Sequence, residues 1–329
     1  MIISRAPLRI SFFGGGTDYP EYFREHNGAV LGTAINKHSY VTASPFQSHL
    51  FDYRLRISYR KVELVRSVGE IEHNVFRECL TFCNLDRDLE LHNMADLPAF
   101  TGLGSSSAFT VSLLQALHSF KGEYRTPMQL AYEAIHVERR LLRENVGCQD
   151  QTLAAVGGFN VIEFRAEDDI VVHRLGLRPE RRTEFEKHLF MVFTGITRKA
   201  VDVASRQLAR VKENERTLQT MRKMVDVGWN ILTSNRDLSE FGALLHEAWS
   251  AKRSLDTGVS NEAIDEMYDA GRNAGAFGGK LLGAGGGGFM LFFAPPEFHY
   301  RLVEAFGAYH TCPVRIDAAG AEVIFSSPE

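Results

Sequence analysis

The segment PAFTGLGSSSAF, residues 98–109, is the stretch from which we interpret this chain. Two glycines in a turn precede three serines, and an apolar pattern of helical period runs from Ser105 to His118. The N-terminus of a helix has unpaired N–H groups and about half a positive charge, so it binds anions. Glycines let phosphate oxygens approach the backbone, and serine hydroxyls donate to phosphate or ligate Mg²⁺. One serine is enough for an ordinary helix N-cap, whereas three after a double-glycine turn favour a phosphate site.

Glycine also gathers in two other places. Three glycines stand together at 14–16, and seven fall between 278 and 288. A single cluster would indicate an ordinary turn, but three clusters beside strand or helix patterns indicate a ligand held by main chain. The stretch 283–288 fits GxGxxG, yet a dinucleotide site needs a strand before it and a helix after it, and here that order is reversed. Neither glycine stretch has the lysine spacing of a Walker A loop.

Two acidic residues are candidates for chemistry. Glu138 falls on the apolar stripe of a helix expected over 127–143, where a carboxylate is costly unless it is paired or binds a cation. A position at the edge of that stripe, in reach of solvent, is the plain alternative. Asp150 lies between Gln149 and Gln151, ahead of a run of small residues, and is a candidate base.

Composition indicates the general class of protein. The 329 residues suggest about two domains, and 44% hydrophobic and 24% charged residues are typical of a globular chain. A net charge of −4 and the lack of a basic run argue against nucleic-acid binding. Arg5 and Arg9 interrupt the apolar N-terminus, which therefore predicts a core strand and no signal peptide. No segment is apolar enough to span a membrane, and the four cysteines form no CxxC pair, so we expect a cytoplasmic protein without membrane contact. The sequence leaves a homodimer open.

Patterns along the chain predict the fold class. Strand patterns come in runs before helix patterns, which favours α+β over a doubly wound parallel sheet. The charged run 178–187 suggests a connector between domains. We therefore expect two domains, residues 1–183 and 184–329.

Three segments together resemble a known family. RAPLRISFFGGGTD (5–18), PAFTGLGSSSAF (98–109) and KLLGAGGGGF (280–289) are similar to the three motifs of the GHMP small-molecule kinases. The resemblance implies a two-domain fold, with an N-terminal domain like the second domain of ribosomal protein S5 and a ferredoxin-like C-terminal domain. It also implies a phosphotransferase with an alcohol acceptor that uses ATP and Mg²⁺.

Further segments narrow the resemblance within that family. FGGGTDYPEYF, CQDQTLAAVGGFNVIEF and AWSAKRSLDTGVSNEAID are similar to the kinases of D-glycero-D-manno-heptose 7-phosphate. Those enzymes phosphorylate the anomeric hydroxyl in bacterial GDP-heptose and surface polysaccharide biosynthesis. L-fucose kinases share the GGGTD form of the first motif and remain an alternative, as does a non-catalytic binding protein of the same fold. Galactokinases carry Gly-Glu-His-Thr-Asp there, so their acidic sugar contact is absent at Gly15.

The resemblance implies roles for individual residues. Asp150 matches the catalytic aspartate, and Arg9 matches the arginine near the transferred phosphoryl group. Ser106 and Glu138 would hold Mg²⁺. The residues expected to hold the ATP phosphates are Gly102, Leu103, Gly104, Ser105, Ser106 and Ser107. The residues expected at the substrate are Gly16, Thr17, Asp18, Thr194, Arg198, Lys199 and Gly285. A phosphorylated acceptor also needs cations, for which Arg54, Arg56, Arg60, Lys61 and Arg253 are further candidates, although each of these is more typical of a solvated surface.

Overall fold

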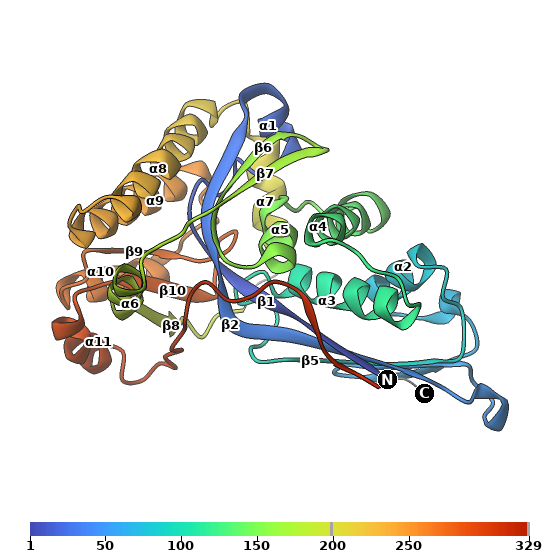
Figure 1. Cartoon of the computed structure of the whole chain (residues 1–329). Coiled ribbons are helices and arrows are strands. Elements are labelled where there is room, and N and C mark those ends of the chain that lie inside the picture. Colours follow the sequence, from blue (N-terminus) through green and yellow to red (C-terminus); the bar gives the residue numbers. More distant parts are fainter. Residues whose placement is uncertain (198–199, 328–329) are drawn as a thin grey trace.

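The computed structural model describes residues 1–197 and 200–327 and contains two β-sheets with helices packed against them (Figure 1). The described strands are β1 (Ile2–Phe13), β2 (Gly28–Pro45), β3 (Leu55–Ser58), β4 (Val62–Val65), β5 (Leu89–Ala95), β6 (Phe159–Ala166), β7 (Asp169–Arg174), β8 (Leu189–Phe193), β9 (Gly278–Leu281), β10 (Phe289–Phe293) and β11 (Glu322–Ser326). The described α-helices are α1 (Pro20–His26), α2 (Asn74–Phe82), α3 (Ser105–Phe120), α4 (Pro127–His136), α5 (Gln149–Val156), α6 (Pro179–Lys187), α7 (Ala200–Ala209), α8 (Glu215–Thr233), α9 (Leu238–Leu255), α10 (Glu262–Asn273) and α11 (His299–Ala305).

The larger sheet has the strand order β11-β1-β2-β5-β3-β4, and β6 and β7 extend it along the first half of β2. Strand β2 is long enough to pair with β6 through residues 28–33 and with β5 through residues 39–45. Helices α3 and α5 pack on β1 and β2 (Figure 1). From Ala6 to Phe13 every residue of β1 is buried, because that stretch lies in the middle of the core.

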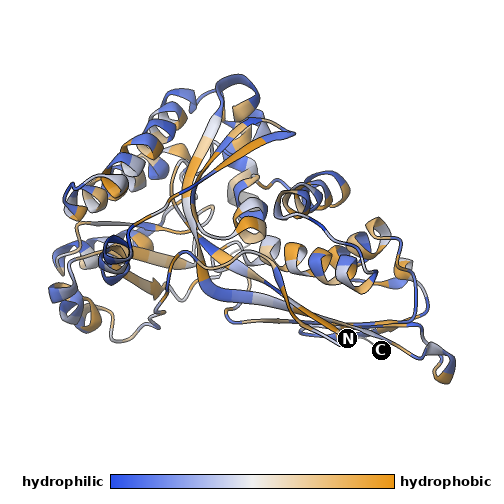
Figure 2. Cartoon of the chain, in the orientation of Figure 1, coloured by the Kyte–Doolittle hydropathy of each residue, from blue (hydrophilic) through white to orange (hydrophobic). Residues whose placement is uncertain are grey.

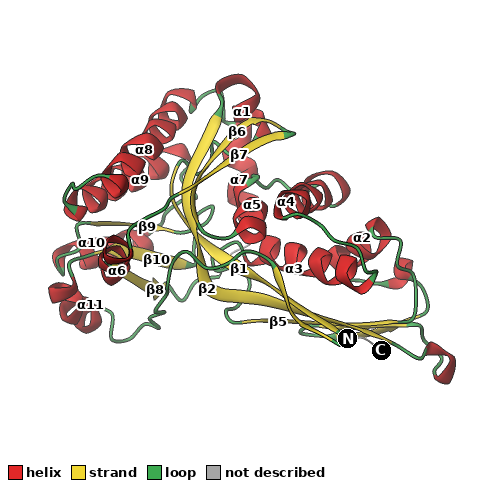
Figure 3. Ribbon diagram, viewed as in Figure 1, coloured by secondary structure: helices red, strands yellow, loops and turns green. Residues whose placement is uncertain are grey.

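The second sheet is antiparallel, with the order β8-β10-β9. All five residues of β10 are buried, and α9 packs against β9 (Figure 3). Phenylalanine rings join the two sheets in one core: the Phe12 and Phe185 centroids are 5.5 Å apart, and those of Phe185 and Phe293 are 5.1 Å apart. Figure 2 shows the apolar residues concentrated along these strands and the inner faces of the helices. The α+β class expected from the sequence is confirmed.

The last strand returns to the first. In β11, Ser326 pairs with Ile2 of β1, so the chain ends in the sheet where it began (Figure 1). The division into domains of residues 1–183 and 184–329 stays a prediction. The pairing of β11 with β1 places strand β11 in the larger sheet. The run expected as a connector forms helix α6, because Pro179 suits a first helical turn and Phe185 is buried against the core.

The helix expected over 127–143 is present but changes character. It begins with a capping box between Thr126 and Gln129, is α-helical to His136, and continues as a π-helical turn over Val137–Leu141. Within the described part of the chain, no helix combines the length and apolar character that crossing a membrane requires.

Candidate active site

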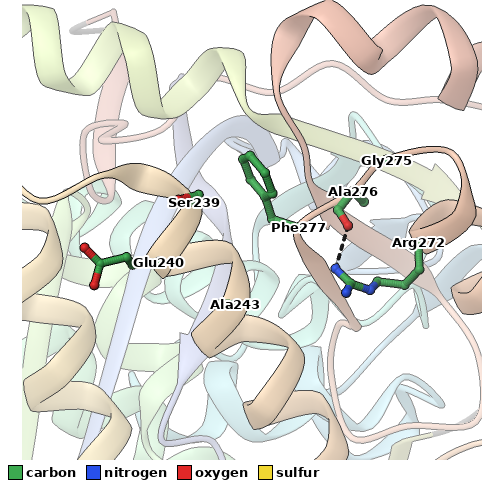
Figure 4. Close-up of a pocket in the computed structure, with 7 residues that line it drawn as sticks. All are labelled: Ser239, Glu240, Ala243, Arg272, Gly275, Ala276 and Phe277. Carbon is green, nitrogen blue, oxygen red and sulfur yellow. Dashed lines mark hydrogen bonds between the residues drawn. The ribbon is translucent and has the colours of Figure 1, made fainter.

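A cleft of about 230 Å³ lies where the three glycine clusters meet. Its walls come from β1 and the loop after it, the start of α3, the segment before and within α5, and the C-terminal half. The residues that line the cleft include Arg9, Ser11, Gly16, Asp18, Gly104, Ser106, Ser107, Glu144, Asp150, Lys252 and Lys280. A separate open depression in the C-terminal half is lined by Ser239, Glu240, Arg272 and Phe277 (Figure 4), where the one contact drawn is Arg272 donating to the Ala276 carbonyl.

The loop before α3 has the backbone of an anion site. Gly104 caps the helix with φ +72°, and the helix begins at Ser105, so the N–H groups of its first turn have no partner within the helix. A Cβ on Gly104 would lie 3.2 Å from the Asp150 carboxylate. The glycine therefore allows both the left-handed turn and the close approach of Asp150 to the loop.

The glycines between residues 278 and 288 support this loop through direct backbone contact. A Cβ on Gly102 would lie 2.4 Å from the Leu282 carbonyl oxygen, and a Cβ on Gly283 would lie 2.6 Å from Gly102 Cα. A Cβ on Gly288 would similarly meet the Thr101 carbonyl at 2.5 Å. Only glycine permits this packing. The main chain of the C-terminal half therefore holds the loop before α3 in place.

Arg9 and Asp150 form a bidentate ion pair beside the loop. Arg9 Nε donates to Asp150 Oδ1 and Nη2 donates to Oδ2, both at 2.7 Å. Arg9 Nη1 donates to the Gly102 carbonyl at 2.6 Å. The Arg9 side chain is 6% exposed and that of Asp150 is 25% exposed, so the carboxylate is the more accessible partner in the cleft. Three of the five guanidinium donors are used, which leaves two for an anionic ligand.

Glu138 lies on the π-helical turn and is buried. Its Oε2 accepts from the Ser107 hydroxyl at 2.9 Å and from the Gln151 amide, while Oε1 has no partner among the described residues. Burial raises the pKa of Glu138 to about 7. A buried carboxylate oxygen without a partner suits a hard cation, and π-helical turns are frequent at functional sites.

In the structure Glu138 is hydrogen-bonded to Ser107, whereas the resemblance implied that Glu138 and Ser106 hold Mg²⁺ together. Ser106 lies on the exposed side of the same helical turn and lines the cleft. Its role as a Mg²⁺ ligand stays a prediction. In the described part of the chain, no group of three or more His, Cys, Asp and Glu side chains suits a metal. An ion here would therefore depend on Glu138, hydroxyl groups and ligand oxygens.

Asp18 also lines the cleft, close enough to Asp150 to interact with its charge. Its Oδ1 accepts from the Gly16 amide at 3.0 Å and its Oδ2 from the Gln149 amide at 3.3 Å. Burial, together with the negative charge of Asp150, raises the pKa of Asp18 to about 6. Such a carboxyl can bind sugar hydroxyl groups near the pair formed by Arg9 and Asp150.

Not every residue predicted from the sequence lies in the cleft. The cleft brings together Arg9, Gly16, Asp18, Gly102, Gly104, Ser105, Ser106, Ser107 and Asp150. Three others have structural contacts elsewhere: the Thr17 hydroxyl donates to the Gly14 and Ala29 carbonyls, the Thr194 hydroxyl donates to Gly288, and Gly285 packs against Val259. Leu103 is fully buried. Arg198 and Lys199 lie outside the described residues. Glu138 is buried and does not line the cleft either. The roles of all these residues, inside the cleft and outside it, stay predictions.

Sequence reasoning missed two lysines of the cleft. Lys252 and Lys280 are both buried and line it. Lys280 lacks the spacing of a Walker A lysine, and Lys252 lies in the segment AWSAKRSLDTGVSNEAID; the resemblance to the family assigned a role to neither lysine. The signal that could have identified Lys252 is its place on the apolar face of a helix, where a charged side chain is unusual.

Comparison with known proteins identifies the family. Residues 60–158 match the model of the GHMP kinases N-terminal domain, and residues 229–308 match that of the GHMP kinases C-terminal domain. The D-glycero-alpha-D-manno-heptose 7-phosphate kinase of Campylobacter jejuni is 30% identical over 318 residues, which covers 92% of each chain. The chain belongs to the GHMP kinases.

Two solved structures named as sugar kinases have the same fold, and with the family match this confirms the two-domain GHMP kinase fold expected from the sequence. A D-glycero-D-manno-heptose 1-phosphate kinase from Bacteriodes thetaiotaomicron superposes with a TM-score of 0.81 at 24% identity and covers 100% of both chains. A sugar kinase from Campylobacter jejuni has a TM-score of 0.72 at 25% identity and covers 98% of this chain and 97% of its own. Its relatives thus place this GHMP kinase among the phosphotransferases that act on sugars. GHMP kinases use ATP, typically with Mg²⁺.

Proposed function

We propose that this GHMP kinase transfers the γ-phosphoryl group of ATP to the anomeric hydroxyl of D-glycero-D-manno-heptose 7-phosphate and forms the 1,7-bisphosphate. The observation that carries the proposal is the Arg9–Asp150 pair, with both hydrogen bonds at 2.7 Å, placed directly against the glycine of a helix N-terminus that suits phosphate. The similarity to the Campylobacter heptose 7-phosphate kinase over 92% of the chain supports the choice of acceptor.

The nucleotide would lie with its phosphates at the start of α3. The first-turn N–H groups and the serine hydroxyls are donors for its oxygens, and the two free N–H groups of Arg9 add positive charge where the phosphoryl group is transferred. Glu138 Oε1 and the Ser106 hydroxyl would hold Mg²⁺, which when bound neutralises charge on the phosphates. Phosphoryl transfer depends mainly on positioning and charge stabilisation, and this cleft supplies both.

Asp150 would act on the acceptor hydroxyl. The sugar oxygen forms a bond to the γ-phosphorus, the bond from that phosphorus to the β–γ bridging oxygen breaks, and ADP leaves. The hydroxyl proton goes to Asp150, whose carboxylate is the more exposed member of its ion pair. Asp18 would accept hydrogen bonds from neighbouring sugar hydroxyls and so set the orientation of the ring.

An ATP-coupled turnover screen tests this function. The panel contains D-glycero-D-manno-heptose 7-phosphate, the same heptose without phosphate, L-fucose and D-galactose, and ³¹P NMR locates the new phosphate. We expect the highest kcat/KM with heptose 7-phosphate and a new phosphate on C1. Preference for L-fucose would favour the alternative supported by two fucokinase relatives, which are 25% and 23% identical over about 90% of this chain. Absence of ATP consumption with every sugar would contradict the proposal.

A further inference from the structure

Two buried lysines are part of the wall that the C-terminal half contributes to the cleft. Lys252 lies on α9 and Lys280 on β9, and the two residues are 8% and 5% exposed. Neither ammonium group forms an ion pair with a carboxylate of the described residues, since the partners of both are main-chain carbonyls. A buried ammonium without a counter-charge is unfavourable. Packing alone therefore does not explain two of them in one cleft.

Both lysines keep a hydrogen-bond donor for a ligand. Lys252 Nζ donates to the Leu281 carbonyl at 3.1 Å and to the carbonyl of Gly283, within the glycine cluster 278–288. Lys280 Nζ donates to the Ser11 and Phe12 carbonyls of β1, each at 2.9 Å. A protonated lysine has three N–H donors, so each ammonium would keep one for an anion that stabilises its charged form.

The surroundings of the two lysines are positive. Burial, followed by the charge of Arg9, lowers the pKa of Lys252 to about 7. Burial, Lys252 and Arg9 lower the pKa of Lys280 well below its usual value. Asp150 is paired with Arg9 and does not balance the two lysines, so a bound anion is what would favour their charged forms. The hydroxyl of Ser11, also in the cleft wall and 8% exposed, has no hydrogen-bond partner among the described residues.

We propose that Lys252 and Lys280, together with the Ser11 hydroxyl, form an anion site that binds a phosphoryl group of the enzyme's substrates. The anion is either the terminal phosphoryl group of ATP or the phosphate that the acceptor already carries. The second of these sources rests on the proposed function, whereas the first requires only that the cleft binds ATP. A phosphate dianion would supply the missing counter-charge to both ammonium groups and accept their remaining donors.

Binding measurements on the full-length protein test the site. Titration calorimetry gives the Kd of MgATP, of heptose 7-phosphate and of unphosphorylated heptose for the wild type, Lys252→Met and Lys280→Met. Lys223→Met is the matched control, because Lys223 is exposed on α8 and does not line the cleft. We expect each cleft variant to weaken one phosphorylated ligand by about 10- to 100-fold, as for loss of a hydrogen bond to a charged group. The control should leave every Kd unchanged.

The arms of the experiment separate the two sources of phosphate. Weaker binding of heptose 7-phosphate alone, with unphosphorylated heptose unaffected, assigns the site to the acceptor. Weaker binding of MgATP alone assigns it to the donor, and this result stands even if heptose 7-phosphate proves not to be a substrate. Unchanged Kd values for both phosphorylated ligands in folded Lys252→Met and Lys280→Met would overturn the proposal while leaving turnover of heptose 7-phosphate untouched.

Proton uptake supplies a readout that a structural lysine would not change. A nearby phosphate raises the pKa of Lys252, so binding near neutral pH takes up protons, which calorimetry detects in buffers of different ionisation enthalpy. Lys252→Arg keeps the charge and is expected to retain affinity but to lose this uptake. Equal proton uptake in the wild type and Lys252→Arg would contradict a ligand at Lys252. The other charged groups lining the cleft, unchanged in this comparison, are Arg9, Asp18, Glu144, Asp150 and Lys280.

Discussion

Asp150 is bound by Arg9 through two hydrogen bonds of 2.7 Å, and its carboxylate faces the glycine that caps α3. The two residues come from opposite ends of the N-terminal half, β1 and the first turn of α5. In this pair the buried guanidinium places a positive charge directly against the carboxylate, beside the loop that suits phosphate. The same guanidinium keeps two donors for the transferred group.

Removal of the Asp150 carboxylate should reduce turnover more than nucleotide binding. We expect Asp150→Ala to lower kcat about 10²- to 10⁴-fold, the usual contribution of a positioned acid or base, with little change in the Kd of ATP. The variant should also melt at a lower temperature, because Arg9 is left buried without its partner. Asp168→Ala, at an exposed turn, is the control. A kcat close to that of the wild type would exclude Asp150 as the catalytic residue.

Glu138 should make stability and Mg²⁺ binding depend on pH in opposite ways. Its pKa is raised from 4.5 to about 7, so the folded protein binds more protons than the unfolded chain between those values. Stability without Mg²⁺ should therefore fall as pH rises through this range, by up to about 3 kcal/mol. Mg²⁺ binding needs the carboxylate and should strengthen as pH rises.

Denaturant unfolding and Mg²⁺ titration of the wild type and Glu138→Gln from pH 5 to pH 8 check this dependence. Asp18 titrates in the same range, since its pKa is about 6, and it is unchanged in the variant, so the difference between the two curves reports Glu138. The variant should show a flatter stability profile and weak Mg²⁺ binding at every pH. Identical profiles would rule out titration of Glu138.

The two neighbouring serines should have separable roles. Ser107 donates to Glu138 at 2.9 Å inside the protein, so Ser107→Ala should lower the free energy of unfolding by about 1 kcal/mol or more. Ser106 is exposed in the cleft, so Ser106→Ala should leave stability unchanged but raise the Mg²⁺ concentration needed for half-maximal activity. Thermal melts and Mg²⁺ activation curves of both variants measure these effects. If Ser106→Ala has normal Mg²⁺ activation, the ligand role carried over from the family does not apply to it.

We expect nucleotide binding to require the contact between the glycines at 102–104 and those between 278 and 288. Gly102→Ala places a Cβ 2.4 Å from the Leu282 carbonyl in a backbone with φ +80°. Gly122→Ala is a matched control, because φ is +73° there and no atom lies within 4 Å of the added Cβ. Both variants bear the cost of a left-handed alanine, about 1–2 kcal/mol, but only Gly102→Ala should also raise the KM for ATP. An equal KM in the two variants would show that the cluster contact is dispensable.

The sequence by itself predicted the α+β class, the main strands and helices, and the phosphate-type loop. These features follow from local patterns: the apolar stretch at the N-terminus, the helical period after Ser105, and glycines where the backbone must take positive φ. The family resemblance also identified Arg9 and Asp150, which the structure brings together. Helix α5 and strand β9 were not predicted, because short segments of small residues carry little periodic signal.

Tertiary structure alone decided which side chains share the cleft. Lys252 and Lys280 are far from β1 in sequence. Lys280 donates to carbonyls of β1, and Lys252 lines the same cleft because α9 packs against β9. In the same way, Glu138 meets Ser107 because a π-helical turn rotates it toward α3, and Thr194 is used in packing against Gly288. Sequence patterns report which face of an element is buried, whereas the choice of partner depends on how distant elements pack, which no local pattern contains.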